Sequence, residues 1–261
     1  MTSFPIDPHN IPMPAPRLIQ PHGSLITPAT YASIREPIRV LSADPPWKPG
    51  DNLPGNGRGA SKKYLTMPTR EIRALPLPPL HKDAILFLWR ISCMVPDAME
   101  VVDTWGHERW CPKHFTQRDV QTHGDMRMWA DKGCPCKKGF TTKTDWCWNK
   151  LTKHGKPWFA MGRYSRASKE ILIVATRGKF TVDDNNFRDA FSAKVPWYEE
   201  GDQIPEGHAV GDYIHSAKPP EFYDLVEKLA GGGPYAELFG RKRRPGWFVA
   251  GNDLPALEDR R

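Results

Sequence analysis

The chain has 261 residues and 39% hydrophobic content, which is enough for one large domain with a core. Thirty-seven basic and 30 acidic residues give a net charge of +7, which suits a polyanionic partner without requiring one. No apolar run approaches the ~20 residues of a membrane span, and Met1–Gln20 lacks the apolar segment of a secretory signal. We therefore predict no membrane association and a cytoplasmic location, where the five cysteines stay reduced.

The chain begins with a proline-rich stretch, residues 1–36, which has no apolar periodicity and predicts an extended arm. The main domain is expected from residue 37 to residue 255, with a short tail at 256–261. Ile38–Ala43 then forms a short apolar run that predicts a buried strand. The glycine-rich polar stretch Lys48–Lys63 predicts a loop, interpreted either as a lid over a bound base or as a surface loop without a role.

Helices and strands are predicted to alternate through the rest of the chain. Residues 107–143 interrupt the pattern, because they are polar and have no period. The expected elements are a helix near Pro68–Leu75, a strand at Ala84–Trp89, a helix at Asp97–Trp105, ordered structure at Asp145–Lys150, a strand at Glu170–Thr176, a helix from Pro219 to the glycines 231–233, and strands at Tyr235–Phe239 and Trp247–Ala250. This alternation predicts an α/β domain with a largely parallel sheet and a ligand-binding edge at the strand carboxyl ends.

The first strand runs into Asp44-Pro45-Pro46-Trp47, a tetrapeptide suited to methylation of an exocyclic amine. Such an amine is a weak nucleophile because its lone pair is delocalised into the ring. Asp44 and the Pro45 carbonyl can accept its two N–H bonds, and the prolines stiffen the loop. Trp47 is expected to stack on the base. A proline-rich turn without a catalytic role is the alternative.

Further blocks follow the tetrapeptide in a fixed order. Together they resemble the MT-A family of adenine-N6 methyltransferases, which includes the messenger-RNA adenosine methyltransferase and bacterial and phage relatives. The blocks are Leu86-Phe87-Leu88-Trp89, Trp105-Gly106, Trp148-Asn149-Lys150, Glu170 through Gly178, Ser216 through Pro219, and Glu237 through Trp247.

This resemblance implies a Rossmann-like methyltransferase fold with a permuted motif order, and S-adenosylmethionine as cofactor. It implies that Asp44, Lys218, Glu237, Arg241 and Asn252 bind the cofactor. Lys218 precedes a helix start and so suits the carboxylate tail, whereas Glu237 and Arg241 suit ribose hydroxyls and the tail. A solvated Lys218, and a buried Glu237 paired with Arg241, are the alternatives.

The resemblance also implies a loop that contacts the target adenosine, comprising Tyr164, Arg166, Ser168 and Glu170. The family often has Asn-Ala-His before this glutamate, where this chain has Ala-Ser-Lys. The departure leaves the contacts to the target strand open, although it does not affect the chemistry. The expected reaction is a direct displacement on a base flipped out of its stack.

Residues 107–143 are interpreted as an insertion that bears cysteine and histidine. Cys111, His114, Cys134 and Cys136 are candidate ligands of a structural zinc ion, although their spacing is irregular for a common zinc finger. A metal-free surface insertion and a disulfide are the alternatives. Basic residues alternate here with aromatic ones, which suggests a target-recognition module that binds nucleic acid.

The predicted activity is methyl transfer to adenine N6 in DNA. An RNA adenosine methyltransferase is the first alternative, and a catalytically silent nucleic-acid-binding partner of the same fold is the second. Methylation of a free small molecule or a glutamine amide is a third, which the basic insertion argues against. The oligomeric state stays open.

Overall fold

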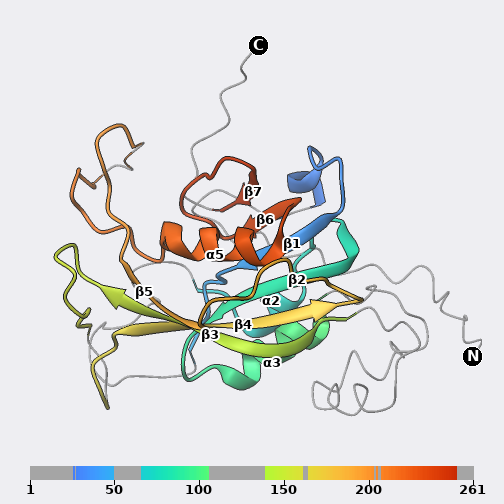
Figure 1. Ribbon diagram of the computed structural model, residues 1–261, viewed down its shortest axis with the longest axis horizontal. Coiled ribbons are helices and arrows are strands. Elements are labelled where there is room, and N and C mark those ends of the chain that lie inside the picture. Colours follow the sequence, from blue (N-terminus) through green and yellow to red (C-terminus); the bar gives the residue numbers. More distant parts are fainter. Residues whose placement is uncertain are drawn as a thin grey trace, which may run out of the picture.

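The computed structural model describes residues 26, 28–49, 66–105, 139–160, 164–202, 204 and 207–251. Their centre is a seven-stranded sheet with the order β5-β3-β4-β2-β1-β6-β7 (Figure 1). The strands are β1 (Ile38–Ala43), β2 (Leu80–Arg90), β3 (Thr141–Leu151), β4 (Lys169–Arg177), β5 (Ala190–Lys194), β6 (Tyr235–Leu238) and β7 (Trp247–Ala250). The helices are the 3₁₀ helix η1 (Pro28–Tyr31), α2 (Thr69–Arg73), α3 (Val95–Thr104) and α5 (Pro220–Ala230).

Every strand pairing in this sheet is parallel except the two that β4 makes, with β2 and with β3. The predicted α/β class and the largely parallel sheet are therefore confirmed. Because β4 runs against its neighbours, its amino end lies at the same edge as the carboxyl ends of β1, β2, β3 and β6. This edge, called here the carboxyl edge, carries the residues after β1 together with the start of β4 and the end of β3.

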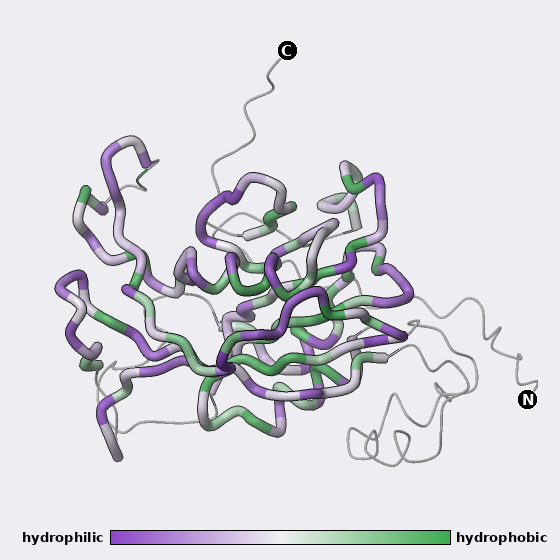
Figure 2. The backbone as a smooth tube through the Cα atoms, in the orientation of Figure 1, coloured by the Kyte–Doolittle hydropathy of each residue, from purple (hydrophilic) through white to green (hydrophobic). Residues whose placement is uncertain are grey.

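The sheet is covered on both faces, by α5 on one side and by α2 and α3 on the other (Figure 1). Strand β2 serves both layers because its side chains alternate: Leu86 and Leu88 pack toward α3, whereas Phe87 packs toward α5. These three side chains are fully buried, and each contributes about 1.5–3 kcal/mol. The central strands accordingly form the hydrophobic interior, as Figure 2 shows.

Helix α5 fixes one side of the carboxyl edge. It begins at Pro220, whose ring is preset for the first helical turn, and it ends at Gly231, which adopts the left-handed conformation with φ 63°. Phe222 and Val226, one turn apart, are both fully buried against the sheet. Their burial fixes the helix start, and therefore Lys218 just before it, at the carboxyl edge.

The predicted elements differ from the structure mainly at their ends. Strand β2 begins at Leu80, before the predicted start, and β5 was not predicted at all. Strand β3 begins at Thr141, so the last residues of the predicted 107–143 insertion belong to the sheet. The end of the predicted arm also joins the domain, because Tyr31 is buried and donates a hydrogen bond to the Pro76 carbonyl (2.9 Å).

Candidate active site

The turn after β1 is held by its own carbonyl groups. The Trp47 N–H donates to the Pro45 carbonyl (2.8 Å), and the Met67 N–H donates to the Pro46 carbonyl (2.6 Å). The second bond ties the tetrapeptide to the segment that leads into α2. Because a carbonyl oxygen has two lone pairs, Pro45 can still accept an N–H from a substrate.

Trp47 occupies a different position from the one its expected stacking role requires. Its side chain is 2% exposed, belongs to the core on the α3 face, and donates its indole N–H to the Trp89 carbonyl (2.9 Å). In this arrangement the ring is buried in the core and anchors the end of the tetrapeptide. Direct stacking of Trp47 on a base stays a prediction and requires its ring to be uncovered.

A network of four charged side chains lies beside the tetrapeptide at the carboxyl edge. The Lys218 ammonium contacts Asp44 Oδ2 at 2.6 Å and Glu170 Oε2 at 2.9 Å. The Lys150 ammonium pairs with the other oxygen of the same carboxylate, Glu170 Oε1. The Ser216 hydroxyl donates to Asp44 Oδ2 at 2.9 Å. The network joins β1, β3, β4 and the segment before α5, and its two lysines balance its two acids.

The network favours the charged forms of Glu170 and Lys218. Burial opposes ionisation of Glu170, but Lys218 and Lys150 outweigh it and lower the pKa of this carboxyl to about 2. Burial also opposes the charged form of Lys218, yet Asp44 and Glu170 raise its pKa above the ordinary value. Lys218 additionally lies over the Trp89 ring, 4.6 Å from its centroid. The solvated Lys218 that was the alternative to a site residue is thus excluded.

Glu237, at the end of β6, is a buried acid with a hydroxyl partner. It is 2% exposed, and both its oxygens accept from the Tyr223 hydroxyl, at 2.9 and 3.0 Å. Burial raises the pKa of Glu237 to about 7 despite this hydrogen bond and the nearby Lys218. Arg241, which follows β6, is half-buried. Its charge opposes the rise that burial causes in the pKa of Tyr198. Glu237 is therefore a buried carboxyl, close to the charged network, whose charged form burial disfavours.

Two segments at the carboxyl edge adopt strained or closely packed backbones. Ser216 and Phe239 have φ values of 67° and 66°, in the left-handed region that non-glycine residues rarely occupy. A Cβ on Gly251 would lie 1.9 Å from the Gly240 carbonyl oxygen, so the backbones after β6 and β7 approach each other directly. Strain of this kind is concentrated at functional sites, and here it flanks Asp44 on one side and Glu237 on the other.

Of the four residues predicted to bind the target strand, the structure brings only Glu170 to the charged network. Tyr164 is 91% exposed, and Arg166 and Ser168 are also exposed, on the connection between β3 and β4. The Arg166 guanidinium lies 5.2 Å from the centroid of the exposed Phe159 ring. Their contacts with substrate stay predictions, and these side chains form a basic and aromatic surface beside the site.

Several predicted site residues lie outside the described part of the chain. Asn252 is one, and the zinc candidates Cys111, His114, Cys134 and Cys136 are the others. Within the described ranges, no group of three or more histidine, cysteine or acidic side chains is arranged to hold a metal ion. The zinc site therefore stays a prediction.

The structure also assigns site contacts to residues for which the sequence predicted no role. Lys150 and Ser216 were noted only as parts of the Trp-x-Lys and Ser-x-Lys-Pro blocks, and Tyr223 was not noted. Their place in short motifs was the available signal for the first two. The third lies one residue after Phe222 on α5, and only the packing of that helix on β6 brings it to Glu237.

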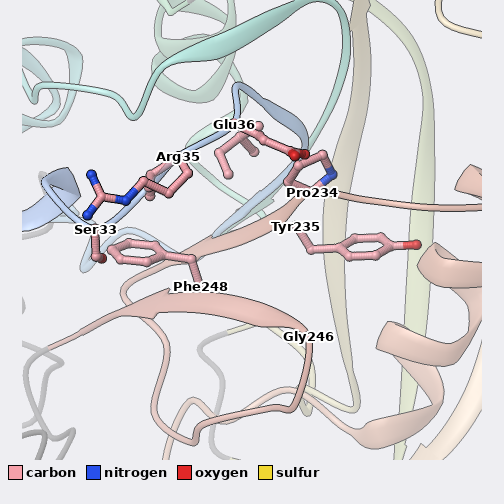
Figure 3. Close-up of a pocket in the computed structure, with 9 residues that line it drawn as sticks. Ser33, Arg35, Glu36, Pro234, Tyr235, Gly246 and Phe248 are labelled. Atoms are coloured by element: carbon pink, nitrogen blue, oxygen red, sulfur yellow. The ribbon is translucent and has the colours of Figure 1, made fainter.

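The residues at this edge fit the chemistry of S-adenosylmethionine. Lys218 is a buried cation suited to a carboxylate tail, and Glu237 is a buried acceptor suited to ribose hydroxyls. Gly240 and Gly251 allow the backbones after β6 and β7 to pack directly on each other beside Glu237. A separate shallow pocket of about 210 Å³ lies at the other edge of the sheet, at the amino ends of β1, β6 and β7 (Figure 3). It is lined by Ser33, Ile34, Arg35, Glu36, Ile38, Pro234, Tyr235, Gly246 and Phe248.

The seven-stranded sheet with helices on both faces is consistent with the class of Rossmann-like methyltransferases, and an acid and a lysine meet at its carboxyl edge. The MT-A70 family matches residues 122–253, which is half of the chain, and the chain belongs to this family.

Three relatives illustrate the similarity. The chain is 26% identical over 225 residues to the N(6)-adenosine-methyltransferase MT-A70-like protein of Drosophila melanogaster, covering 84% of this chain and 27% of the relative. It is 25% identical over 232 residues to the human N(6)-adenosine-methyltransferase catalytic subunit METTL3, covering 86% and 30%. It is 22% identical over 220 residues to the human N(6)-adenine-specific methyltransferase METTL4, covering 84% and 38%. The chain thus spans less than two fifths of each relative. Across the described residues, no helix is long and apolar enough to cross a bilayer.

Proposed function

We propose that the protein transfers a methyl group from S-adenosylmethionine to the exocyclic N6 amine of adenine in nucleic acid. The observation that carries this proposal is the placement of Asp44. Its side chain is 16% exposed, and both contacts that fix it, from Lys218 and Ser216, fall on Oδ2. Among the described residues no hydrogen bond to Oδ1 is seen, so this oxygen is free to accept an N–H from a substrate amine.

The proposed chemistry assigns each group at the site one task. S-adenosylmethionine, when bound, supplies a methyl group activated by the sulfonium charge. Asp44 Oδ1 and the Pro45 carbonyl accept the two N–H bonds of the amine and orient its lone pair. The Asp44 carboxylate also stabilises the positive charge that develops on the amine nitrogen, whose extra proton then passes to water. Lys218 and Ser216 hold the carboxylate at the angle that these contacts need.

The proposal also names the type of nucleic acid, which is DNA. DNA is the substrate predicted from the sequence, and RNA is its alternative. The relatives' names specify adenosine for METTL3 and adenine for METTL4, which supports adenine N6 chemistry in both cases. The basic and aromatic surface of Phe159, Tyr164 and Arg166 supports a nucleic-acid substrate of either kind.

The test is methylation by the purified protein with isotope-labelled S-adenosylmethionine. Duplex DNA, single-stranded DNA and RNA are offered separately, together with free adenosine, and the products are digested to nucleosides for mass spectrometry. Label on adenine N6 in DNA supports the full proposal, and label only in RNA corrects the polymer. Label on cytosine, on free adenosine alone, or on nothing contradicts it.

The Asp44→Asn variant tests the role of the acid. It keeps the size of the side chain but removes its charge, so turnover should fall by about 10²-fold or more while S-adenosylmethionine still binds. Asp189→Asn is the matched control, because Asp189 is exposed and lies on the segment before β5. Calorimetric titration with the cofactor checks binding. Loss of cofactor binding in Asp44→Asn alone would show that this acid acts through the cofactor site or the fold and not on the amine.

A further inference from the structure

Glu170 has two cations, whereas one ion pair would be enough to neutralise it. Lys150, at the end of β3, contacts Oε1, and Lys218 contacts Oε2 at 2.9 Å. Lys218 is shared with Asp44, which it approaches more closely, at 2.6 Å. Lys150 has no second acid among its contacts in the described residues, so its charge is available to Glu170 alone.

Several contacts also fix the position of Lys150. Its side chain is 12% exposed, and its ammonium lies 4.9 Å from the centroid of the Trp148 ring, two residues earlier on the same strand. The Lys150 N–H donates to the Ser168 carbonyl (2.9 Å), which joins β3 to the chain just before Glu170. The backbone and the side chain thus hold Lys150 against the carboxylate, whereas Lys218 lies on a loop before a helix.

Binding of a methyl donor is therefore expected to change the contacts of Lys218 but not those of Lys150. Lys218, as the buried cation at the helix start, is the residue that would hold the carboxylate tail of a donor, and that tail would compete with Glu170 for its ammonium. With Lys218 engaged in this way, Glu170 would keep its charge only if a second cation remained. A half-buried carboxylate without a partner would otherwise take up a proton and become a donor.

We propose that Lys150 is a positioning residue that keeps Glu170 charged and in place as an acceptor for the target nucleoside once Lys218 has turned to the methyl donor. This inference rests on the proposed function and deepens it, since it separates the two lysines of one site. Lys218 serves the cofactor and Asp44, and Lys150 serves the substrate side through Glu170.

The groups that face Glu170 come from three directions. Lys150 faces it from β3 and Lys218 from the segment before α5, and Asp44, just after β1, lies across Lys218. Glu237 of β6 interacts with Lys218 through space. Removal of Lys150 leaves Glu170 with one shared cation, so the pKa of Glu170 rises from about 2, most of all with the donor bound.

The direct test is a carbon-13 NMR titration of the Glu170 carboxyl, assigned by comparison with Glu170→Gln. Wild type and Lys150→Met are titrated with and without S-adenosylhomocysteine, which has the same carboxylate tail. In the wild type Glu170 should stay ionised down to the acid limit of folding in both states. In Lys150→Met with the ligand bound it should titrate at least about one pH unit higher, because one charge partner is lost. Equal titration of the two proteins overturns the inference.

Kinetics give a second and separate readout. Lys150→Met should raise KM for the nucleic acid about tenfold, the size expected for loss of one charge-assisted contact, with a smaller change in kcat. The acid limb of kcat/KM should move to higher pH, and Lys150→Arg should restore both. Lys153→Met is the matched control, since Lys153 is exposed and follows the same strand. A Lys150→Met profile identical to wild type overturns the inference.

The design separates failure of the inference from failure of the proposed function and from misfolding. If the wild type methylates no nucleic acid, the function fails, and the NMR titration still tests Lys150. Within a Glu170→Gln background, Lys150→Met should have no further effect, because its partner is already neutral. An equal loss in both backgrounds shows that Lys150 acts elsewhere, which also overturns the inference. Lys150→Gln, which removes the charge but keeps a polar side chain, keeps the test usable if Lys150→Met unfolds.

Discussion

Replacement of Lys218 by methionine should reveal how much of the stability of the carboxyl edge depends on one cation. The Lys218 side chain is 3% exposed and makes two ion pairs, with Asp44 and Glu170. Methionine fills a similar volume but carries no charge, so both carboxylates lose a partner. Removal of one member of a buried ion pair costs about 3–5 kcal/mol when the other charge is left uncompensated.

The structure places this variant at the lower end of that range. Glu170 keeps Lys150, and Asp44 keeps the Ser216 hydroxyl and some contact with water. The shift of the Glu170 pKa from 4.5 to about 2 corresponds to about 3 kcal/mol, which the two lysines share. The ion pair with Asp44 adds less, because water partly screens this partly exposed carboxylate. We therefore expect Lys218→Met to lower the free energy of unfolding by about 3 kcal/mol at pH 7, or the melting temperature by roughly 6–12 °C.

The loss should depend on pH with a definite sign. Because the folded pKa of Glu170 lies below its unfolded value, its contribution is complete above about pH 4.5 and disappears as the pH falls toward about 2. Urea denaturation of wild type and Lys218→Met between about pH 2.5 and 8 should therefore show a gap that is constant above about pH 4.5 and narrows below it. Addition of Asp44→Asn to the variant should recover part of the loss. A gap that stays constant with pH, or a variant as stable as wild type, would refute the reasoning.

Three other substitutions test the surroundings. Burial raises the pKa of Glu237 to about 7, so the folded protein keeps this proton at a pH where the unfolded chain has lost it. From pH 4.5 to 7, wild type should therefore lose stability relative to Glu237→Gln, by about 3 kcal/mol at most. Urea denaturation of both proteins at the two pH values measures this difference. Gly251→Ala places a Cβ 1.9 Å from the Gly240 carbonyl oxygen and should cost about 1–3 kcal/mol in thermal melts. Trp47→Phe leaves the Trp89 carbonyl without its indole donor and should cost about 1–3 kcal/mol by the same measurement; a smaller loss would mean that water replaces the donor.

The parts of the fold that the sequence predicted are those where one local pattern decides the structure. Ile38–Ala43 is buried at nearly every position, as its short, mostly apolar run indicated, and its length favoured a strand over a helix. Strand β5 gave no such signal, because Ala190–Lys194 is a short edge strand with three of its five side chains exposed. Its pairing with β3 decides its conformation, and that partner is distant in sequence.

The candidate site divides in the same way. Asp44 and Lys218 were predicted because each stands at a boundary, one after a strand and the other before a helix, where charged side chains meet ligands. Trp47 shows the limit of this reasoning: an aromatic residue beside an acid suggested stacking, but only the folded structure reveals that its ring is buried and its indole N–H faces the Trp89 carbonyl. The role of Lys150 depends on the register between β3 and β4, which no local pattern encodes.

That register has a further consequence for the spacing of charge at the carboxyl edge. Lys218 lies over the Trp89 ring at 4.6 Å, and Lys150 lies over the Trp148 ring at 4.9 Å. The two indoles contact each other edge to face, with centroids 6.2 Å apart. Each cation therefore rests on one member of a packed aromatic pair, and the separation of the two ammonium groups is set by rigid rings rather than by flexible lysine chains. Glu170 fits between them because β4 lies next to β3, so the buried core determines where charge is available to a substrate.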